Sequence, residues 1–572
     1  MKVFIIGLDG ASLDLLLPWI EAGQLPGFAR LVREGCHSNL ESVPNQRSAA
    51  AWTSFQTGKN PGKHGIFEFY ERIPNTYDIR FVNGGNRDGA SFFRLASDAG
   101  RCVVAINVPM SYPAEAVNGA ILAGLDAPGS RSKGFSHPPD LIDEVEAATG
   151  TYVIEPGLTG CIVNGEIDRA VRLLQEELDS KIRVTRFLMS EYPWDLFVTV
   201  FRSTDAAHHC FWKYHDSEHP LFDRTAARKY GSVILEAYQR IDRFLLEILD
   251  GLGGDTMLLI VSDHGCGPKH PAGNQLNLWL ESMGYLAYEK DRAGPGNLVT
   301  RLVGEAYRWT LAKTPRRTKE HLWRVLPGLR NRVQARLCFS GIDWARTRAF
   351  SDSLFPNVWI HVKGRDPFGI VEPGRPYESL CDEIATRLRA SRDEASGQPI
   401  VDEVFHRSRI YSGLHVDGAP DLLVRWREDT RIRGLAIPSQ PDGVSGSARR
   451  RADAGRPFIP GEDYRVISGD HRLNGILLCK SPAQGAPGRL QCRAGLVDVA
   501  PTVLYALGVP IPDDMDGEIV TPLFGPAFLA SHPPLRRKPE AGGGAGPPQV
   551  TSYAKEDEEQ VRQRLRGLGY LE

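Results

Sequence analysis

The chain has 572 residues, enough for a large core, and it is almost neutral, with 68 Lys and Arg against 70 Asp and Glu. This balance lacks the strongly basic field that is typical of proteins that bind nucleic acid polymers or membrane surfaces. We therefore expect no nucleic acid polymer as a partner, and the composition does not indicate an oligomeric state.

The cysteines and the N-terminus indicate a compartment. Nine cysteines are scattered along the chain, odd in number and without a C-x-x-C pair, as is typical of reduced thiols in the cytosol. The first apolar run, Val3 to Leu8, is too short for a signal peptide or for a membrane span of about 20 residues. We expect a cytoplasmic protein without a transmembrane segment.

The first half of the chain alternates apolar runs with helical patterns. The run from Val3 to Leu8 predicts a strand that is covered on both faces. Two long amphipathic helices, at 166–191 and 225–252, each lead into a buried strand, at 195–201 and 256–261. The other expected elements are helices at 12–21, 25–34, 49–56 and 90–99 and strands at 37–43, 103–106 and 120–123.

The second half is less regular. Residues 270–460 lose the alternation and indicate an inserted cap, after which a strand at 474–479 and a helix at 496–507 resume it. Strands that alternate with long helices predict an α/β fold with a doubly wound, mostly parallel central sheet and helices on both faces. We expect a catalytic core at 1–269 and 461–525, the smaller cap at 270–460, a Pro/Gly-rich linker at 526–550 and a charged helical tail at 551–572.

The segment from Glu41 to Phe67 is where the chemistry is expected to concentrate. Within it, Ser48 stands between a predicted strand and a predicted helix, at the positive end of the helix dipole. Free backbone N–H groups at such a position favour a phosphate or an attacking oxygen. The same position also suits an ordinary N-cap, a common role of serine. Other residues must decide between the two interpretations.

Carboxylates occur at the ends of several predicted strands. Asp9 follows the first strand, Asp205 comes just after the strand at 195–201, and Asp263 follows the strand at 256–261. Because the carboxyl ends of parallel strands meet at one edge of a sheet, where ligands bind, we expect these side chains to converge with Ser48.

Histidines accompany the carboxylates at spacings typical of metal ligands. Asp205 and His209 are four residues apart, so a helix would put them on one face. His264 follows Asp263 directly, and His471 precedes the strand at 474–479. Alone, an aspartate after a strand is often a turn residue, and D-x-x-x-H occurs by chance, but their joint order favours a site. One metal would take Asp205, His209 and His471, and the other would take Asp9, Asp263, His264 and the Ser48 oxygen.

This ligand set favours two tetrahedral sites of nitrogen and oxygen donors, which suits zinc, with manganese as the alternative. Two divalent ions about 3.5–4 Å apart form a clamp for in-line displacement at phosphorus. We expect Ser48 to be the catalytic nucleophile and to form a phosphoseryl intermediate that water then hydrolyses.

Several motifs resemble the alkaline phosphatase superfamily, in particular its type I phosphodiesterase/nucleotide pyrophosphatase-like branch. They are GLDG, TSFQTGKNPGKHGIF, TDAAHH, VSDHGCGP, SGDHRLNGILL and VDVAPTVLYALGVPIPDDMDG. NVPMSYP and the final LRGLGYLE are similar to a bacterial phosphohydrolase/phosphomutase subgroup. The resemblance implies a two-metal hydrolase of phosphate esters with Ser48, ten residues before Gly58, as nucleophile. It implies metal ligands at Asp9, Asp205, His209, Asp263, His264 and His471.

The departures from the family pattern bear on the substrate. Nucleotide-cleaving members place an asparagine shortly after the HGI motif, but residues 64–69 read HGIFEF here. Nucleotide pyrophosphatase activity is therefore not implied by this segment, and Arg47, Arg202 and Lys59 are candidates for binding the substrate's negative charge. Sulfatases need a C/S-x-P-x-R setting, whereas three alanines follow Ser48.

We therefore predict a metal-dependent phosphohydrolase, first of all a phosphodiesterase, that acts on a small phosphorylated substrate. The alternatives within the superfamily are a phosphomonoesterase and a phosphomutase, in which the phosphoryl group returns to the substrate; a closed cap that excludes water would favour the mutase. A binding protein without turnover is disfavoured, because a decayed enzyme would be expected to lose at least one ligand.

Overall fold

The computed structural model describes residues 1–270, 275–289, 341–352, 356–428, 435, 466–538 and 553–568. The other parts of the predicted cap, linker and tail lie outside the described residues.

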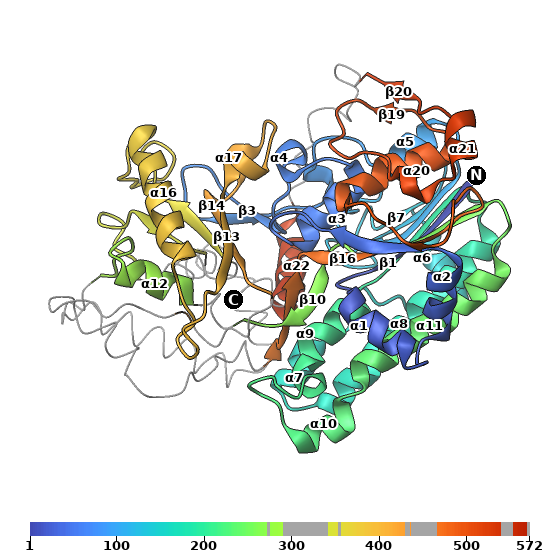
Figure 1. Cartoon of the computed structure of the whole chain (residues 1–572), viewed down its shortest axis with the longest axis horizontal. Coiled ribbons are helices and arrows are strands. Elements are labelled where there is room, and N and C mark those ends of the chain that lie inside the picture. Colours follow the sequence, from blue (N-terminus) through green and yellow to red (C-terminus); the bar gives the residue numbers. More distant parts are fainter. Residues whose placement is uncertain are drawn as a thin grey trace.

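A ten-stranded sheet forms the centre of the molecule (Figure 1). In spatial order its strands are β17 (Gly488–Arg489), β2 (Cys36–Glu41), β16 (Asn474–Lys480), β9 (Thr256–Val261), β1 (Lys2–Leu8), β8 (Leu196–Phe201), β5 (Val103–Val108), β6 (Gly119–Ala123) and β7 (Ser136–His137), with β18 (Ala494–Gly495) also beside β2. The neighbours from β9 to β6 are parallel. β16 is antiparallel to both β9 and β2, so β2 runs in the same direction as β9.

Helices cover both faces of this sheet. One face carries α1 (Leu13–Glu21), α2 (Pro26–Glu34), α6 (Leu141–Thr149), α7 (Leu158–Val163), α8 (Ile167–Glu191), α9 (Ser203–His215) and α11 (Val233–Gly251), and the other carries α3 (Ser48–Thr57), α5 (Phe92–Asp98) and α20 (Val499–Leu507). Because side chains alternate along a strand, Phe4 and Ile6 of β1 join the first layer and Val3 and Ile5 the second. The predicted doubly wound α/β fold is confirmed.

One predicted helix is wrong. The single helix expected at 225–252 is two helices, α10 (Arg224–Tyr230) and α11, separated at Gly231 and Ser232. Glycine is about 1 kcal/mol less favourable than alanine inside a helix, and Ser232 is the N-cap of α11. The interruption lets α10 and α11 pack separately.

The described part of the insertion forms a smaller unit beside the core (Figure 1). It has its own buried cluster around the four strands β11 (Ala349–Phe350), β12 (Asn357–Ile360), β14 (Leu422–Trp426) and β13 (Val401–His406), with α12 (Leu276–Ser282) and α16 (Arg375–Arg389). The short helix α17 (Arg407–Ile410) follows β13 and has no buried residue. A hairpin of the core, β3 (Tyr70–Arg72) and β4 (Ile79–Phe81), reaches this unit. There Arg72 Nη2 lies 2.7 Å from Asp366 Oδ1, and Tyr77 stacks on Trp344 at 4.0 Å. The exact domain boundaries stay a prediction.

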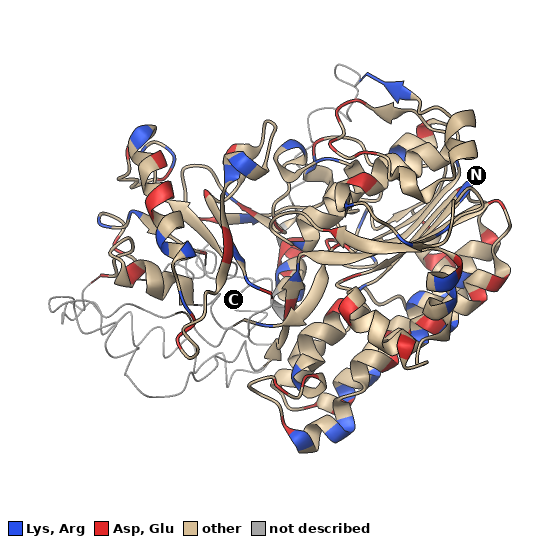
Figure 2. Ribbon diagram, in the orientation of Figure 1, with Lys and Arg blue, Asp and Glu red and all other residues tan. Residues whose placement is uncertain are grey.

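The C-terminal helix α22 (Lys555–Gly567) packs on the core. Val561 and Leu565 are buried, and the Tyr553 hydroxyl donates to the Asp126 carbonyl at 2.6 Å. Short elements complete the described chain: α4 (Pro61–His64), α21 (Pro526–Ser531), β10 (Gly265–Pro268), β15 (Gly469–Arg472), β19 (Ile511–Pro512) and β20 (Arg536–Arg537). Figure 2 shows that charged residues gather on the helices and avoid most of the central strands. Among the described residues, no helix has both the length and the apolar character that a membrane crossing requires.

Candidate metal centre

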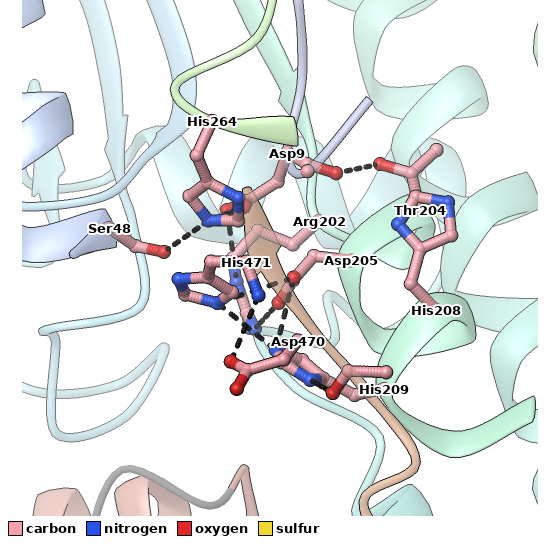
Figure 3. Close-up of polar contacts among 12 residues, drawn as sticks. Asp9, Ser48, Arg202, Thr204, Asp205, His208, His209, His264, Asp470 and His471 are labelled. Atoms are coloured by element: carbon pink, nitrogen blue, oxygen red, sulfur yellow. Dashed lines mark hydrogen bonds and ion pairs between the residues drawn. The ribbon is translucent and has the colours of Figure 1, made fainter. Parts of the chain in front are cut away.

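The topology brings the predicted ligands to one edge of the sheet. Asp9 follows β1, Asp263 follows β9, and Asp205 lies in the first turn of α9, which begins after β8. His471 lies in β15, just before β16, and because β16 is antiparallel the residues before it lie at the edge where the parallel strands end. Figure 3 shows the side chains of Asp9, Asp205 and His471 converging with Ser48.

Two glycines allow the close packing behind this edge. Gly10 has a φ of +70°, and its N–H donates to Asp263 Oδ1 at 3.2 Å, so the chain turns sharply after Asp9. A Cβ at Gly7 would lie 2.7 Å from the Trp52 ring, so glycine lets α3 approach β1 directly. Trp52 Nε1 in turn donates to Asp9 Oδ2 at 3.3 Å.

The first ligand group consists of Asp205, His209 and His471, whose ligand atoms all lie within 4.8 Å of one another. His209 Nε2 lies 3.2 Å from Asp205 Oδ1 and 3.2 Å from His471 Nε2. His471 Nε2 is 3.8 Å from the same carboxylate oxygen. Three potential donors thus point at one small volume.

The second group consists of Asp9, Asp263 and His264, again within 4.8 Å. His264 Nε2 lies 3.5 Å from Asp9 Oδ1, 3.3 Å from Asp263 Oδ2 and 3.2 Å from Ser48 Oγ. The rings of His264 and His471 stack at 3.6 Å, because Cys266 and His471 are opposite each other in the β10–β15 pair. The two groups are therefore neighbours.

The tautomers of the three histidines follow from their backbone contacts. Each Nδ1 faces a carbonyl oxygen: His209 faces Gly469 at 2.8 Å, His471 faces Gln46 at 2.6 Å, and His264 faces Gly265 at 2.8 Å. A carbonyl can only accept, so Nδ1 carries the proton and Nε2 of the neutral ring presents a lone pair to the centre. The lone pairs of His209 and His471 would then face each other across 3.2 Å, so this pair favours a bound cation, either a metal ion or a proton.

The buried carboxylates of the two ligand groups also favour a bound cation. Asp9 and Asp263 are fully buried and Asp205 is 2% exposed. Among the described residues, no hydrogen bond reaches Asp9 Oδ1, Asp205 Oδ2 or Asp263 Oδ2. Burial, followed by the charge of Asp205, raises the pKa of Asp263 to about 7, and burial with the neighbouring Asp263 and Asp205 raises that of Asp9. Bound divalent cations would supply the missing partners, so these residues fit a metal centre.

Asp205 and His209 behave as a charge pair in the protein without metal. Burial alone would raise the pKa of Asp205, but the charge and hydrogen bond of His209 lower it well below its usual range. Conversely, burial lowers the pKa of His209, and Asp205 outweighs burial and raises it. In the absence of metal, this charge pair favours a proton on His209 where a metal cation would bind.

Ser48 has a more specific position than an N-cap. The N-cap of α3 is Arg47, and Ser48 is the first residue of the helix, so the N-cap interpretation of Ser48 is wrong. The Ser48 hydroxyl points to His264 (Figure 3). It lies at the helix N-terminus, beside the second ligand group, where the dipole favours negative charge.

The three predicted substrate-binding residues lie in different places. Arg47 lines a cavity of about 800 Å³ between the core and the insertion, together with His471. Arg202 is 3% exposed and lies behind the centre, with Nε 3.6 Å from Asp9 Oδ2 and Nη2 3.8 Å from Asp205 Oδ2. Lys59 is not brought to the centre: its ammonium group pairs with Asp514 Oδ2 at 2.6 Å, and it does not line the cavity.

Sequence reasoning missed three residues near the centre. Trp52 contacts Asp9 and stands four residues after Ser48, so helical spacing would have placed both on one face. Asp470 lines the cavity, and the repeated Asp-His pair, 263–264 and 470–471, was the signal for it. Glu68 also lines the cavity, where the HGI motif is followed by Phe-Glu-Phe.

A doubly wound sheet with a serine and two Asp/His groups at its edge is typical of a phosphate-ester hydrolase. The model of one protein family, described as type I phosphodiesterase / nucleotide pyrophosphatase, matches residues 3–444, so the chain belongs to this family. The predicted resemblance is thereby confirmed. Members of the family are metal-dependent.

No curated protein matches the chain in sequence. Among solved structures, phosphonoacetate hydrolase from Sinorhizobium meliloti in complex with phosphonoformate is similar at 15% identity, with 89% of this chain and 95% of that chain covered and a TM-score of 0.45. Murine ectonucleotide pyrophosphatase/phosphodiesterase 5, as an inactive variant in complex with AMP, is similar at 12% identity, with 92% and 100% covered and a TM-score of 0.47. The human form of the latter has the same values.

Proposed function

We propose that this chain is a metal-dependent phosphodiesterase that acts through a phosphoseryl intermediate on Ser48. The observation that carries the proposal is the pair of ligand groups beside Ser48, with three imidazole Nε2 atoms directed into the centre and their Nδ1 atoms held by carbonyls. This arrangement is complete before any substrate binds.

Two divalent cations fit the donor set, with zinc as the first choice for its nitrogen and oxygen ligands and manganese as the alternative. Asp205, His209 and His471 would hold one, and Asp9, Asp263, His264 and the Ser48 oxygen would hold the other. When bound, such ions lower the pKa of a hydroxyl group or water and offset charge on phosphoryl oxygens.

The reaction divides into two displacements at phosphorus. In the first, the Ser48 oxygen forms a bond to phosphorus while the bond between phosphorus and the leaving alcohol's oxygen breaks, and the alcohol takes up a proton. In the second, water attacks the phosphoserine, the serine oxygen leaves, and a phosphomonoester is released. Ser48 Oγ lies 3.2 Å from His264 Nε2, so a cation held by His264 would also bind the serine oxygen and fix its position.

Arg47 is the candidate for binding the phosphoryl group, because it precedes Ser48 and lines the cavity. Its guanidinium group can donate to non-bridging oxygens in the geometry that arginine favours. Arg202 lies behind the ligand carboxylates, where its charge offsets theirs. A small phosphorylated molecule in the cavity is the expected substrate.

The test compares bis-p-nitrophenyl phosphate with p-nitrophenyl phosphate, in the presence of zinc or manganese, for the wild type and Ser48→Ala. Metal-dependent hydrolysis of the diester should fall by about 10⁴-fold or more in the variant, since the nucleophile is gone. A phosphorylated Ser48 peptide in rapidly quenched wild-type samples, identified by mass spectrometry, would demonstrate the intermediate.

Ser54→Ala is the matched control, because it makes the same chemical change on the same helix, where Ser54 instead contacts His64 at 2.9 Å. It should keep most of the diester activity. A wild type that prefers the monoester would replace the proposal with a phosphomonoesterase. Unchanged turnover in Ser48→Ala would rule out Ser48 as nucleophile.

A further inference from the structure

The arginine beside the nucleophile has a dedicated carboxylate partner. Arg47 Nε lies 3.5 Å from Glu68 Oε2, and the two side chains are 11% and 10% exposed. Both residues line the cavity that contains His471. A charge pair thus stands where the substrate's phosphoryl group must enter.

Glu68 is held firmly in this position. Its Oε1 accepts the N–H of Phe69 at 2.9 Å, which leaves Oε2 directed to Arg47. Asn45 Nδ2 donates to the carbonyl of Phe67 at 2.8 Å, so the segment that carries the arginine is tied to the segment that carries the glutamate. Among the described residues, no hydrogen bond reaches Glu68 Oε2. Its charge is therefore available to the cavity and to Arg47.

The charge of this pair matters because the two substrate classes differ by one negative charge. A phosphodiester carries one negative charge at every pH of interest, whereas a phosphomonoester carries two above its second pKa of about 6. An ionised carboxylate next to Arg47 offsets the attraction of the guanidinium charge, and at a given distance it repels a dianion twice as strongly as a monoanion. A buried site screens such differences weakly.

We propose that Glu68 is a specificity-determining residue that makes the site select singly charged phosphodiesters over doubly charged phosphomonoesters, by neutralising Arg47 beside the nucleophile. This inference rests on the proposed phosphodiesterase function and adds the charge class of its substrate. Glu68 acts through Arg47 and contacts no reacting atom, so it is a positioning residue and not a catalytic one.

The test uses the isosteric change Glu68→Gln in the metal-loaded full chain. The amide oxygen can still accept the Phe69 N–H, and the buried charge is removed. Burial raises the pKa of Glu68 to about 7, against the lowering effect of Arg47, so assays at pH 8.5 compare an ionised wild type with an uncharged variant. The measured quantity is kcat/KM for bis-p-nitrophenyl phosphate divided by kcat/KM for p-nitrophenyl phosphate. We expect this ratio to fall at least about tenfold, with the monoester's kcat/KM rising.

Inorganic phosphate gives a second readout. At pH 8.5 it is a dianion, and we expect it to inhibit Glu68→Gln at least about tenfold more tightly than the wild type. A variant that was merely distorted would bind phosphate more weakly and would lose activity on both substrates alike.

Glu71→Gln is the matched control. Glu71 lines the same cavity, but its carboxylate lies 2.6 Å from the exposed Arg80 and is 39% exposed. It should leave both the ratio and phosphate inhibition unchanged. An unchanged ratio in Glu68→Gln, or an equal shift in Glu71→Gln, would overturn the inference while leaving the phosphodiesterase proposal intact. Diester turnover that survives Ser48→Ala would instead overturn the proposed function itself.

Discussion

Asp205 in the core and Asp421 in the insertion are both buried aspartates, but their surroundings differ. Asp421 accepts from both terminal nitrogens of Arg365 at 2.8 Å, from the Tyr377 hydroxyl at 2.8 Å and from the Ile360 N–H at 2.7 Å. Burial would raise the pKa of Asp421, and Arg365 lowers it. In contrast, Asp205 Oδ2 accepts no hydrogen bond from the described residues, and Oδ1 faces two imidazole nitrogens.

The difference separates a structural carboxylate from a proposed ligand carboxylate. Asp421 has a full set of donors and needs nothing from solution, so it stabilises the insertion. Asp205 and its neighbours have vacant lone pairs in a buried place, which is costly unless a cation fills it. Four substitutions test this difference.

His471→Ala should have the largest effect, because it removes a ligand and leaves Asp205 with one imidazole. We expect diester turnover to fall by about 10³-fold or more, equivalent to about 4 kcal/mol of transition-state stabilisation. Metal content per chain, measured by elemental mass spectrometry, should fall by about half. His532→Ala, at an exposed histidine, is the control. Full metal content in His471→Ala would contradict the assignment of this ligand.

Asp421→Asn should destabilise the insertion and spare the centre. Breaking a buried ion pair costs about 3–5 kcal/mol, and the loss here should lie near the lower value, because Asp421 is fully buried but Arg365 is half-buried and keeps its contact with Asp366. Hydrogen exchange should accelerate in β12 and β14, while metal content stays at the wild-type level. The control is Asp402→Asn, since Asp402 is 48% exposed in its pair with Arg425. Loss of metal in Asp421→Asn would mean that the two regions are not independent.

The hydrogen bonding of Asp126 is intermediate between that of Asp421, which has a full set of donors, and that of Asp205, which has vacant lone pairs. Its Oδ2 accepts the N–H groups of Gly84 and Tyr112, at 3.1 and 2.9 Å, while Oδ1 accepts no hydrogen bond from the described residues. Burial raises the pKa of Asp126 to about 6, so the folded state binds this proton more tightly than the unfolded state. The resulting stability is complete below about pH 4 and is lost as the pH rises through about 6.

Asp126→Asn should therefore gain about 3 kcal/mol relative to the wild type between pH 4 and pH 7.5. Urea denaturation of both proteins at several pH values measures the difference, in which the other titrating groups cancel. A difference that does not vary with pH would show that Asp126 keeps an ordinary pKa in the folded protein.

Arg186→Ala should have the smallest effect. Arg186 forms two-pronged contacts with Glu247 at 2.7–3.0 Å, but the side chains are 50% and 54% exposed. Solvent and salt screen such a pair, so the free energy of unfolding should change by less than about 1 kcal/mol. Thermal unfolding at low and at high salt measures it, and a loss of several kcal/mol would mean that exposure is a poor guide in this protein.

Much of the core could be predicted from the sequence because local signals are strong there. Continuous apolar runs predicted β1, β8 and β9, and the residues after them share an edge by topology alone. This reasoning also predicted that Ser48, three aspartates and three histidines converge, and the structure brings these side chains together. Their individual roles stay predictions until the variants are measured.

The remaining features depend on contacts that no local pattern shows. The partner of Lys59 is Asp514, 455 residues away in sequence, so its removal from the centre was not predictable. Arg202 stands at the start of a helix, and a charged residue there is normally exposed. In the structure it is buried, next to the carboxylates of Asp9 and Asp205. The break at Gly231 was visible in the sequence, but the amphipathic pattern on either side concealed it.

The antiparallel strand β16 affects the order in which the protein can fold during translation. β16 lies between β9 and β2 and is the last long strand of the sheet in chain order. A ribosome that has completed residues 1–270 has made every proposed ligand except His471, but β2 still lacks the strand that joins it to β9. The nucleophile helix and the rest of the centre can therefore reach their final arrangement only after the entire insertion has been translated. Nascent chains that stop inside the insertion lack β16 and His471, and therefore lack one of the proposed metal ligands.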